Sequence, residues 1–282
     1  MFAHNESHLI RRCLESVAAA PLPEQTTCFV LVNGCNDDTF QVAQQYAKSA
    51  PWVQVVNIPI GDKSNAWNVF IHDLATFANC YFFLDGDCIV EPGSFDALET
   101  ALAQRTDINA ASGVPSTDNL STGAYRRELT QDGGLAGNLY ALSGNFVQRI
   151  QEMKVYLPIG FIGDDSLVGA LALWDLETTK EWDRRHLVVC EQARFVYESV
   201  WTATLRNPLF YIRRRQRYSL RHFQNQLLAN RLKSQGIGAM PERVDFLYAN
   251  ASESELKPRP HIVDYFFDYM TIRAVRASQR KR

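Results

Sequence analysis

Hydrophobic and polar positions along the first half of the chain predict strands that alternate with helices. Short apolar runs, each long enough for a buried strand, lie at 28–32, 53–58 and 81–84. Helical patterns with one apolar face lie before and between them, at 9–17, 40–48 and 66–77. Strands that alternate with helices of about 10–15 residues are typical of βαβ units. We therefore expect an α/β fold with a mainly parallel sheet.

The second half of the chain has a looser pattern. Strands are expected at 108–114, at 139–147 with an interruption at 143–145, and as short pieces at 187–189 and 195–197. Helices are expected at 95–103, 125–129, 167–174 and 208–233. The acidic, proline-bearing stretch 252–260 predicts a linker before a last helix at 262–277.

The apolar run at 81–84 leads directly into two carboxylates, Asp85 and Asp87, separated by Gly86. Parallel sheets bind ligands at the carboxyl ends of their strands. With no side chain at Gly86, both acids can turn toward one point. Carboxylate oxygens suit Mg²⁺ or Mn²⁺, whose coordination is usually completed by substrate phosphates. An acidic turn without a ligand is the alternative from these residues alone.

Polar clusters also follow the other predicted strands, at 4–6, 33–38 and 61–65. A doubly wound sheet gathers such loops along one edge, beside the point where nucleotides bind. Lys63 would bring a cation to that edge, and the next helix would bring its N-terminal N–H groups, which together suit a diphosphate. A solvated loop lysine is the alternative for Lys63.

Composition and charge narrow the class of protein. The 282 residues carry a formal net charge of −2, with 46% hydrophobic and 21% charged residues, so we expect a globular protein without a nucleic-acid partner. The six cysteines form no C-x-x-C pair. No apolar run approaches the ~20 residues of a membrane-spanning helix, and no signal peptide is recognisable. We therefore expect a cytoplasmic protein.

Basic side chains are concentrated in two segments. Six arginines and no acid lie within 205–222, and the last ten residues hold four arginines and Lys281. The arginine run predicts contact with an anionic ligand or lipid headgroup, with a solvated helix face as the alternative.

The order of these motifs resembles family 2 glycosyltransferases of the GT-A fold, from the N-terminus to about residue 222. The segment 2–6 looks like the family's opening strand end with its Asn-Glu pair. The segment 32–39 looks like its Asp-Asn/Asp-Gly-Ser-x-Asp-x-Thr turn, and 61–68 is similar to Gly-Lys-x-x-Ala-x-Asn. Asp85-Gly86-Asp87 matches the Asp-x-Asp motif, Asp164-Asp165 its later acidic pair, and 214–218 resembles Gln/Arg-x-x-Arg-Trp.

The resemblance implies a Rossmann-like GT-A domain, with a mainly parallel central sheet and flanking helices. In this chain the domain would span 1–235, with a nucleotide-sugar-binding half at 1–114 and an acceptor-binding half at 115–235. A linker and a C-terminal helical extension would follow at 236–282.

The implied activity is transfer of a sugar, with inversion, from a nucleotide-diphosphate donor to a carbohydrate or lipid-linked acceptor. A UDP-sugar is the expected donor, and cell-surface polysaccharide or glycolipid synthesis the expected setting. Asp85 and Asp87 would hold Mn²⁺ or Mg²⁺. Asp165 would be the catalytic base, with Asp164 as the next candidate; a helix cap is the alternative for either. Donor binding would involve Ala3, His4, Asn5, Glu6, Asn33, Asp37, Lys63, Asp85, Gly86 and Arg217.

The chain departs from the family's pattern at several positions. Val32 replaces the first acid of the turn, which leaves Asn33 to pair with the nucleobase and keeps GDP- and dTDP-sugars open. Tyr218 replaces a tryptophan, and the membrane helices of processive synthases are absent, so we expect a non-processive enzyme. In the family, several residues usually precede the position of Phe2.

Two other functions remain open from the sequence. Residues 82–89 also resemble the nucleophile motif of haloacid-dehalogenase-like phosphatases, with Asp164 and Asp165 as late metal-binding acids. Alternatively, the chain is a non-enzymatic scaffold at the membrane periphery. In the last helix, apolar residues can share one broad face with basic residues near its end, which predicts contact with an anionic membrane at the inner face. This face comprises Tyr265, Phe266, Tyr269, Ile272 and Val275, with Arg273, Arg276, Arg280 and Lys281.

Overall fold

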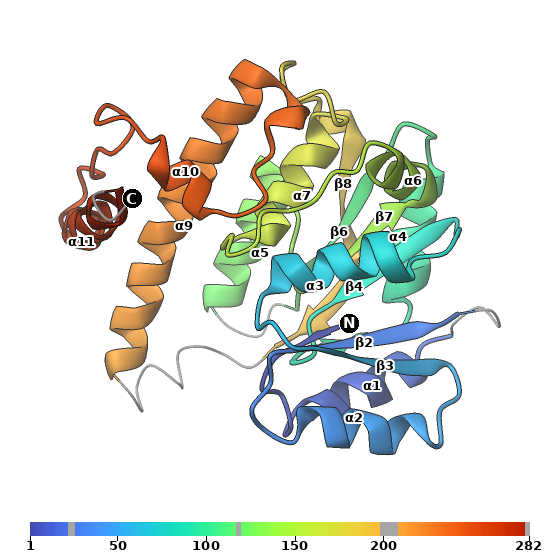
Figure 1. Cartoon of the computed structure of the whole chain (residues 1–282). Helices are drawn as coiled ribbons and strands as arrows, with labels where there is room; N and C mark the ends of the chain where they lie inside the picture. Colours follow the sequence, from blue (N-terminus) through green and yellow to red (C-terminus); the bar gives the residue numbers. More distant parts are fainter. Residues whose placement is uncertain (22–25, 117–119, 198–207, 280–282) are drawn as a thin grey trace.

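The computed structural model describes residues 1–21, 26–116, 120–197 and 208–279 (Figure 1). Its first sheet is parallel, with the strand order β1 (Phe2–Ala3), β2 (Cys28–Asn33) and β3 (Val53–Ile58). Its connecting helices are α1 (Ile10–Ala18), α2 (Thr39–Ala47) and α3 (Lys63–Val69), the last continued by a π-helical turn (Phe70–Leu74). Asp62 caps α3, because its carboxylate accepts a hydrogen bond from the Asn65 N–H at 2.7 Å.

The second sheet is mixed, in the order β4-β7-β6-β8-β5. Its strands are β4 (Cys80–Leu84), β5 (Ile89–Val90), β6 (Ala110–Pro115), β7 (Leu139–Ser143) and β8 (Leu187–Val196). Only β6 and β8 pair in parallel here; β4 pairs antiparallel with β7. The expected α/β class with flanking helices is confirmed, but the expected parallel pairing of 81–84 is wrong. An apolar run indicates a strand that is buried on both faces, but it does not indicate whether the neighbouring strand runs parallel or antiparallel to it.

The two sheets meet at the acidic strand end. Phe2 and Asp85 form a parallel bridge, and the Gly86 N–H donates to the Phe2 carbonyl at 2.7 Å. A Cβ at Gly86 would lie 3.0 Å from that oxygen and 3.1 Å from Ile10 Cδ1. Glycine is therefore needed here because β1 and α1 approach so closely, which differs from the role that we expected for it between two acids.

The remaining helices are α4 (Ser94–Ala103), α5 (Leu120–Asp132), α6 (Gly144–Glu152), α7 (Asp164–Leu173), α9 (Pro208–Gln235), α10 (Asp245–Ala249) and α11 (Ile262–Gln279). The expected strand at 139–147 ends at Ser143, whose hydroxyl accepts from the Phe146 N–H and caps α6. The two strands expected at 187–189 and 195–197 are one strand, β8, although its pairing with β6 shifts register between Val189 and Arg194, where Glu191 and Gln192 are exposed.

The C-terminal extension packs on the rest of the chain. In Figure 1, α11 lies beside α9, and its Ile272 and Val275 join the main hydrophobic core. The second sheet also draws strands from both sides of residue 114, so the two predicted halves share one sheet and do not pack separately. Within the described ranges, no helix is both long and apolar enough to cross a bilayer.

A buried carboxylate joins α11 to α9. Asp268 accepts from the Ser219 hydroxyl at 2.7 Å and from Arg259 through its N–H, Nε and Nη2. Burial opposes the ionisation of Asp268, but these hydrogen bonds outweigh it and lower the pKa of the carboxyl. Its contribution to stability is therefore present above its unfolded-state pKa of about 3.9 and is lost as the pH falls.

We expect Asp268→Asn to lower the free energy of unfolding by about 2 kcal/mol at neutral pH, because hydrogen bonds to a charged group are lost. Urea unfolding would measure the change, and the difference from wild type should shrink in acid. Asp73→Asn, at an exposed position, is the control. Equal stability of wild type and Asp268→Asn at neutral pH would contradict this role.

Candidate active site

Loops from three strand ends interlock at one edge of the parallel sheet. His4 Nδ1 lies 2.6 Å from the Asn33 carbonyl, and the Asn5 side-chain oxygen accepts from the Asn36 N–H at 2.9 Å. Asp37 accepts from the N–H groups of Ser7 and Thr39, each at 3.1 Å. Slight burial opposes ionisation of Asp37, but the hydrogen bonds prevail and lower its pKa to about 2. Of these residues, His4, Asn5, Asn33 and Asp37 were expected to bind the donor, and in the structure they join the loops to one another.

The third loop contacts the other two through glycines. Gly34 has a φ of +57°, and a Cβ there would lie 2.3 Å from the Gly61 Cα. A Cβ at Gly61 would in turn lie 3.3 Å from His4 Cε1. His4 is exposed beside this junction, and its expected role in donor binding stays a prediction.

Asn33 occupies a different position from the one that we expected. Its side chain is buried, and its amide donates to the Ala3 carbonyl at 3.0 Å. An amide that satisfies the backbone inside the sheet is not presented to a base, so the structure does not support pairing of Asn33 with the nucleobase. Glu6 likewise contributes through its backbone, since its N–H donates to the Thr39 hydroxyl at 2.7 Å.

Lys63 connects acids from two distant parts of the sequence. Its Nζ lies 2.6 Å from Asp85 Oδ1 and 3.5 Å from Asp164 Oδ2. Burial would lower the pKa of Lys63, but the two carboxylates raise it well above its ordinary value. Burial raises the pKa of Asp85 to about 6, against the opposing effect of Lys63, and burial also raises that of Asp164. Lys63 is therefore a half-buried counter-ion to these acids, and its predicted contact with phosphate stays a prediction.

Asp165 lies at the start of α7 and contacts α9. The Arg221 guanidinium is 3.1 Å from Asp165 Oδ1 and also bonds the Ser166 hydroxyl. The N-cap of α7 is Gly163, without a side-chain cap bond, so the helix-cap alternative for Asp164 and Asp165 is wrong. Gly163 has a φ of +110°, and a Cβ there would lie 2.7 Å from Arg221 Nε. Glycine is thus needed both for the backbone turn and for the approach of Arg221.

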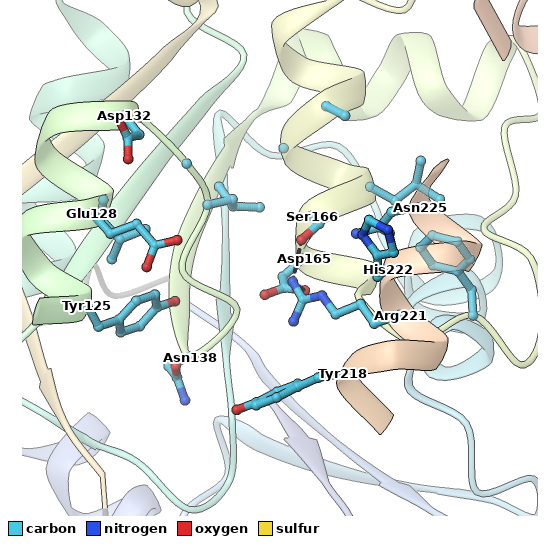
Figure 2. Close-up of a pocket in the computed structure, with 18 of the residues that line it drawn as sticks. Tyr125, Glu128, Asp132, Asn138, Asp165, Ser166, Tyr218, Arg221, His222 and Asn225 are labelled. Atoms are coloured by element: carbon cyan, nitrogen blue, oxygen red, sulfur yellow. Dashed lines mark hydrogen bonds and ion pairs between the residues drawn. The ribbon is translucent and has the colours of Figure 1, made fainter. Parts of the chain in front are cut away.

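A cleft of about 1260 Å³ opens above these groups, between α5, α7 and α9. Asp87, Asn138, Asp165, Tyr218 and Arg221 line it together. Figure 2 shows Asp165, Ser166 and Arg221 on one side, opposite Tyr125, Glu128 and Asp132 of α5. The lining of the cleft also includes large apolar side chains, which are Leu135, Leu167, Leu173, Trp174, Trp182, Leu187, Leu228 and Leu232, among others.

The structure does not bring Arg217 into this cleft. Its neighbours Arg214, Tyr218, Arg221 and Asn225 line the cleft, because residues three or four apart share one face of α9. Arg217 lies on another face and is exposed. Sequence reasoning missed Arg221, although the helical spacing from Tyr218 could have identified it. Asn138, which lines the cleft from the loop before β7, had no comparable signal.

Asp87 is the carboxylate best placed for a divalent cation. It lines the large cleft and a smaller neighbouring pocket, and a 3.4 Å contact from the Cys88 thiol is its one side-chain hydrogen bond within the described residues. No three His, Cys, Asp or Glu side chains form a ready-made metal cluster in the described part of the chain. One or two carboxylates fit Mn²⁺ or Mg²⁺ when a diphosphate supplies the other ligands. Lys63 forms ion pairs with Asp85 and Asp164, and Arg221 forms one with Asp165. Among the described residues, Asp87 is in no ion pair.

Comparison with protein families decides the class of the protein. The sequence model of glycosyltransferase-like family 2 matches residues 2–237. The chain belongs to this family. Membership contradicts the phosphatase alternative and places the chain among enzymes, so the scaffold alternative is also excluded as its sole function. No curated protein sequence matches the chain.

Solved structures with the same fold are glycosyltransferases. A mannosyltransferase from Pyrobaculum calidifontis, in complex with GDP-Man and Mn²⁺, has a TM-score of 0.60 at 16% identity, covering 99% of this chain and 85% of that one. TarS from S. aureus with UDP-GlcNAc has a TM-score of 0.52 at 14% identity, covering 99% and 89%. A glucosyl-3-phosphoglycerate synthase from Mycobacterium tuberculosis, with Mn²⁺ and UDP-glucose, has 0.50 at 17%, covering 85% and 77%. At these identities the similarity shows the GT-A fold alone.

Proposed function

We propose that this protein transfers a sugar from a nucleotide-diphosphate sugar, most simply a UDP-sugar, to an acceptor hydroxyl with inversion at the anomeric carbon. The observation that carries the proposal is that Asp165 of α7 and Asp87 beyond β4 line the same cleft. Nucleotide-sugar complexes of proteins with this fold support the donor class. Transfer of single sugars at the cytoplasmic side, in cell-surface polysaccharide or glycolipid synthesis, is part of the same proposal.

In this mechanism Asp165 accepts the proton of the acceptor hydroxyl. The acceptor oxygen then forms its bond to the anomeric carbon as the bond to the diphosphate breaks, and the electron pair leaves with the diphosphate. Arg221 holds the Asp165 carboxylate from the α9 side and keeps it oriented toward the cleft. Attack from the face opposite the leaving group inverts the configuration.

Departure of the diphosphate requires neutralisation of its developing charge. Asp87, assisted by Asp85, would hold Mn²⁺ or Mg²⁺, which supplies Lewis-acid stabilisation of the leaving group when bound. Lys63 fixes Asp85 and the start of α7 in one position, so ion pairs of Lys63 connect the donor and acceptor sides of the site. Arg214, which lines the cleft, is the arginine best placed for a phosphate oxygen, in place of Arg217.

The apolar residues that line the cleft favour an acceptor with an apolar or aromatic portion beside its reacting hydroxyl. Trp182, 55% exposed, packs edge-on against buried Trp174, with their ring centroids 5.8 Å apart. A carbohydrate ring or the apolar group of a lipid-linked acceptor could pack against such a wall.

We expect Trp182→Ala to raise the acceptor KM roughly tenfold, equivalent to about 1.4 kcal/mol of lost contact, with donor affinity unchanged. Initial rates at varied acceptor concentration would measure it. Met153→Ala, an exposed apolar position outside the cleft, is the control. An unchanged KM would show that Trp182 is not part of the acceptor site.

The decisive experiment incubates the protein with a panel of nucleotide sugars, Mn²⁺ and candidate carbohydrate or lipid-linked acceptors. NMR of the product would report the anomeric configuration. The proposal expects release of nucleoside diphosphate that depends on acceptor, and a product anomer opposite to that of the donor. Retention of configuration would refute the inverting mechanism, and nucleotide release without any transfer product would refute the transferase assignment.

A further inference from the structure

The outer face of α11 carries the side chains that a surface helix normally buries. Along this face five large hydrophobic residues are exposed: Ile262 by 82%, Tyr265 by 52%, Phe266 by 59%, Tyr269 by 53% and Met270 by 38%. We call these five residues, together with exposed Arg273 and Arg276, the outer face of α11. Their spacing of three or four residues aligns them along one side of the helix.

The acids of α11 lie on its inner side. Asp264 is 2.7 Å from Arg215 of α9, and Asp268 is buried against Arg259 and Ser219. The outer face therefore contains no carboxylate of its own helix, and its nearest acidic contact is Glu253, 3.5 Å from Arg276. A helix that only covered the core would have the opposite arrangement, with apolar residues inside and charges outside.

The structure corrects the face that the sequence suggested. Ile272 and Val275 face the core, whereas Ile262 and Met270 join Tyr265, Phe266 and Tyr269 outside. Docking of the inner side of α11 on the core therefore leaves its outer face exposed for the membrane contact that the sequence predicts. Arg280 and Lys281 lie outside the described residues. Leu209 and Ile212 are exposed apolar residues on the first turns of α9. They are close in sequence to Arg215, which contacts Asp264 of α11.

We propose that the outer face of α11 binds the surface of an anionic membrane. Tyrosine and phenylalanine partition into the interface between headgroups and acyl chains, and the two arginines meet the anionic headgroups. A second copy of the chain fits less well, because two such faces would bring arginines together with no acid on either outer face. Anionic lipid supplies the charge that this face lacks.

This surface also has a consequence for the acceptor. Because α9 contacts α11 and also contributes Arg221 to the cleft, this one helix would connect a bilayer at α11 with the cleft. A lipid-linked acceptor could then reach Asp165 from the membrane. That consequence rests on the proposed function, whereas membrane binding needs no nucleotide sugar and is tested without one.

The test is flotation of the full chain with vesicles of phosphatidylcholine, either alone or mixed with phosphatidylglycerol. We expect binding to the anionic vesicles only, and its loss at high salt. Phe266→Ser with Tyr265→Ser should reduce partitioning roughly tenfold or more, and Arg273→Gln with Arg276→Gln roughly thirtyfold. Thermal unfolding of these variants should stay near wild type, because all four positions are exposed.

Matched controls are Phe77→Ser, at an 82% exposed position, and Arg184→Gln, both away from α11 and expected to bind as wild type does. Failure of the wild type to float with anionic vesicles would overturn the proposal. So would equal binding by the outer-face variants. A dimer in solution that the Phe266→Ser/Tyr265→Ser variant dissociates, without vesicle binding by the wild type, would assign the face to a second copy instead.

Discussion

Asp165→Asn lowers the rate of sugar transfer by about two to four orders of magnitude, the usual contribution of a general base. The substitution preserves the shape of the side chain and removes the atom that accepts the proton. The fold should be unaffected, since Gly163 and not Asp165 is the N-cap of α7. Donor binding should remain near wild type, because the donor loops and Asp87 are untouched. Transfer rates at saturating donor and donor titrations would measure both quantities.

Two other cleft or near-cleft carboxylates separate this role from a general loss of negative charge. Glu128→Gln removes an exposed carboxylate from the opposite wall and should keep near-wild-type activity. Asp164→Asn removes a buried partner of Lys63 and should reduce stability as well as activity. If Asp165→Asn retains more than about a tenth of wild-type transfer, equivalent to less than about 1.4 kcal/mol, another group is the base.

The sequence could predict where Asp85, Asp87 and the loop at 33–38 lie in the sheet for a simple physical reason. Apolar runs mark buried strands, and polar residues that follow them must lie at a sheet edge, so Asp85, Asp87 and the loop at 33–38 were located by pattern alone. The direction of pairing could not be read in the same way. β4 is buried on both faces as an antiparallel partner of β7, and its apolar run would be the same in a parallel ladder.

The remaining features of the site depend on contacts between segments far apart in the sequence. Lys63 and Asp164 are about a hundred residues apart, and no local pattern indicates that the first residue of α3 will pair with two acids. Asn33 has a polar side chain in a predicted ligand loop, yet its amide is used by the Ala3 carbonyl. The choice of Arg217 instead of Arg221 is a different kind of error. Helical periodicity was available there and was overridden by a linear motif.

Asp87→Asn abolishes the stabilisation of the protein by nucleotide sugar in the presence of Mn²⁺. A donor at about 100 times its Kd stabilises a protein by about 2.7 kcal/mol, which corresponds to a rise in Tm of roughly 5 °C or more in a chain of this size. The rise requires that the cation bridge Asp87 and the diphosphate. It should therefore disappear in the Asp87→Asn protein and, for the wild type, in excess chelator.

The matched control is Asp96→Asn, which removes an exposed carboxylate from α4, outside the cleft, and should keep the full Tm rise. Asp165→Asn should also keep it, because it removes the base and not the metal ligand. Asp87→Asn and Asp165→Asn thus fail at different steps, donor binding in one and proton removal in the other. An equal Tm rise with donor in chelator and in Mn²⁺ would show that the diphosphate is held without a metal. Lys63, Arg214 and the N-terminus of α3 would then be the groups that neutralise it.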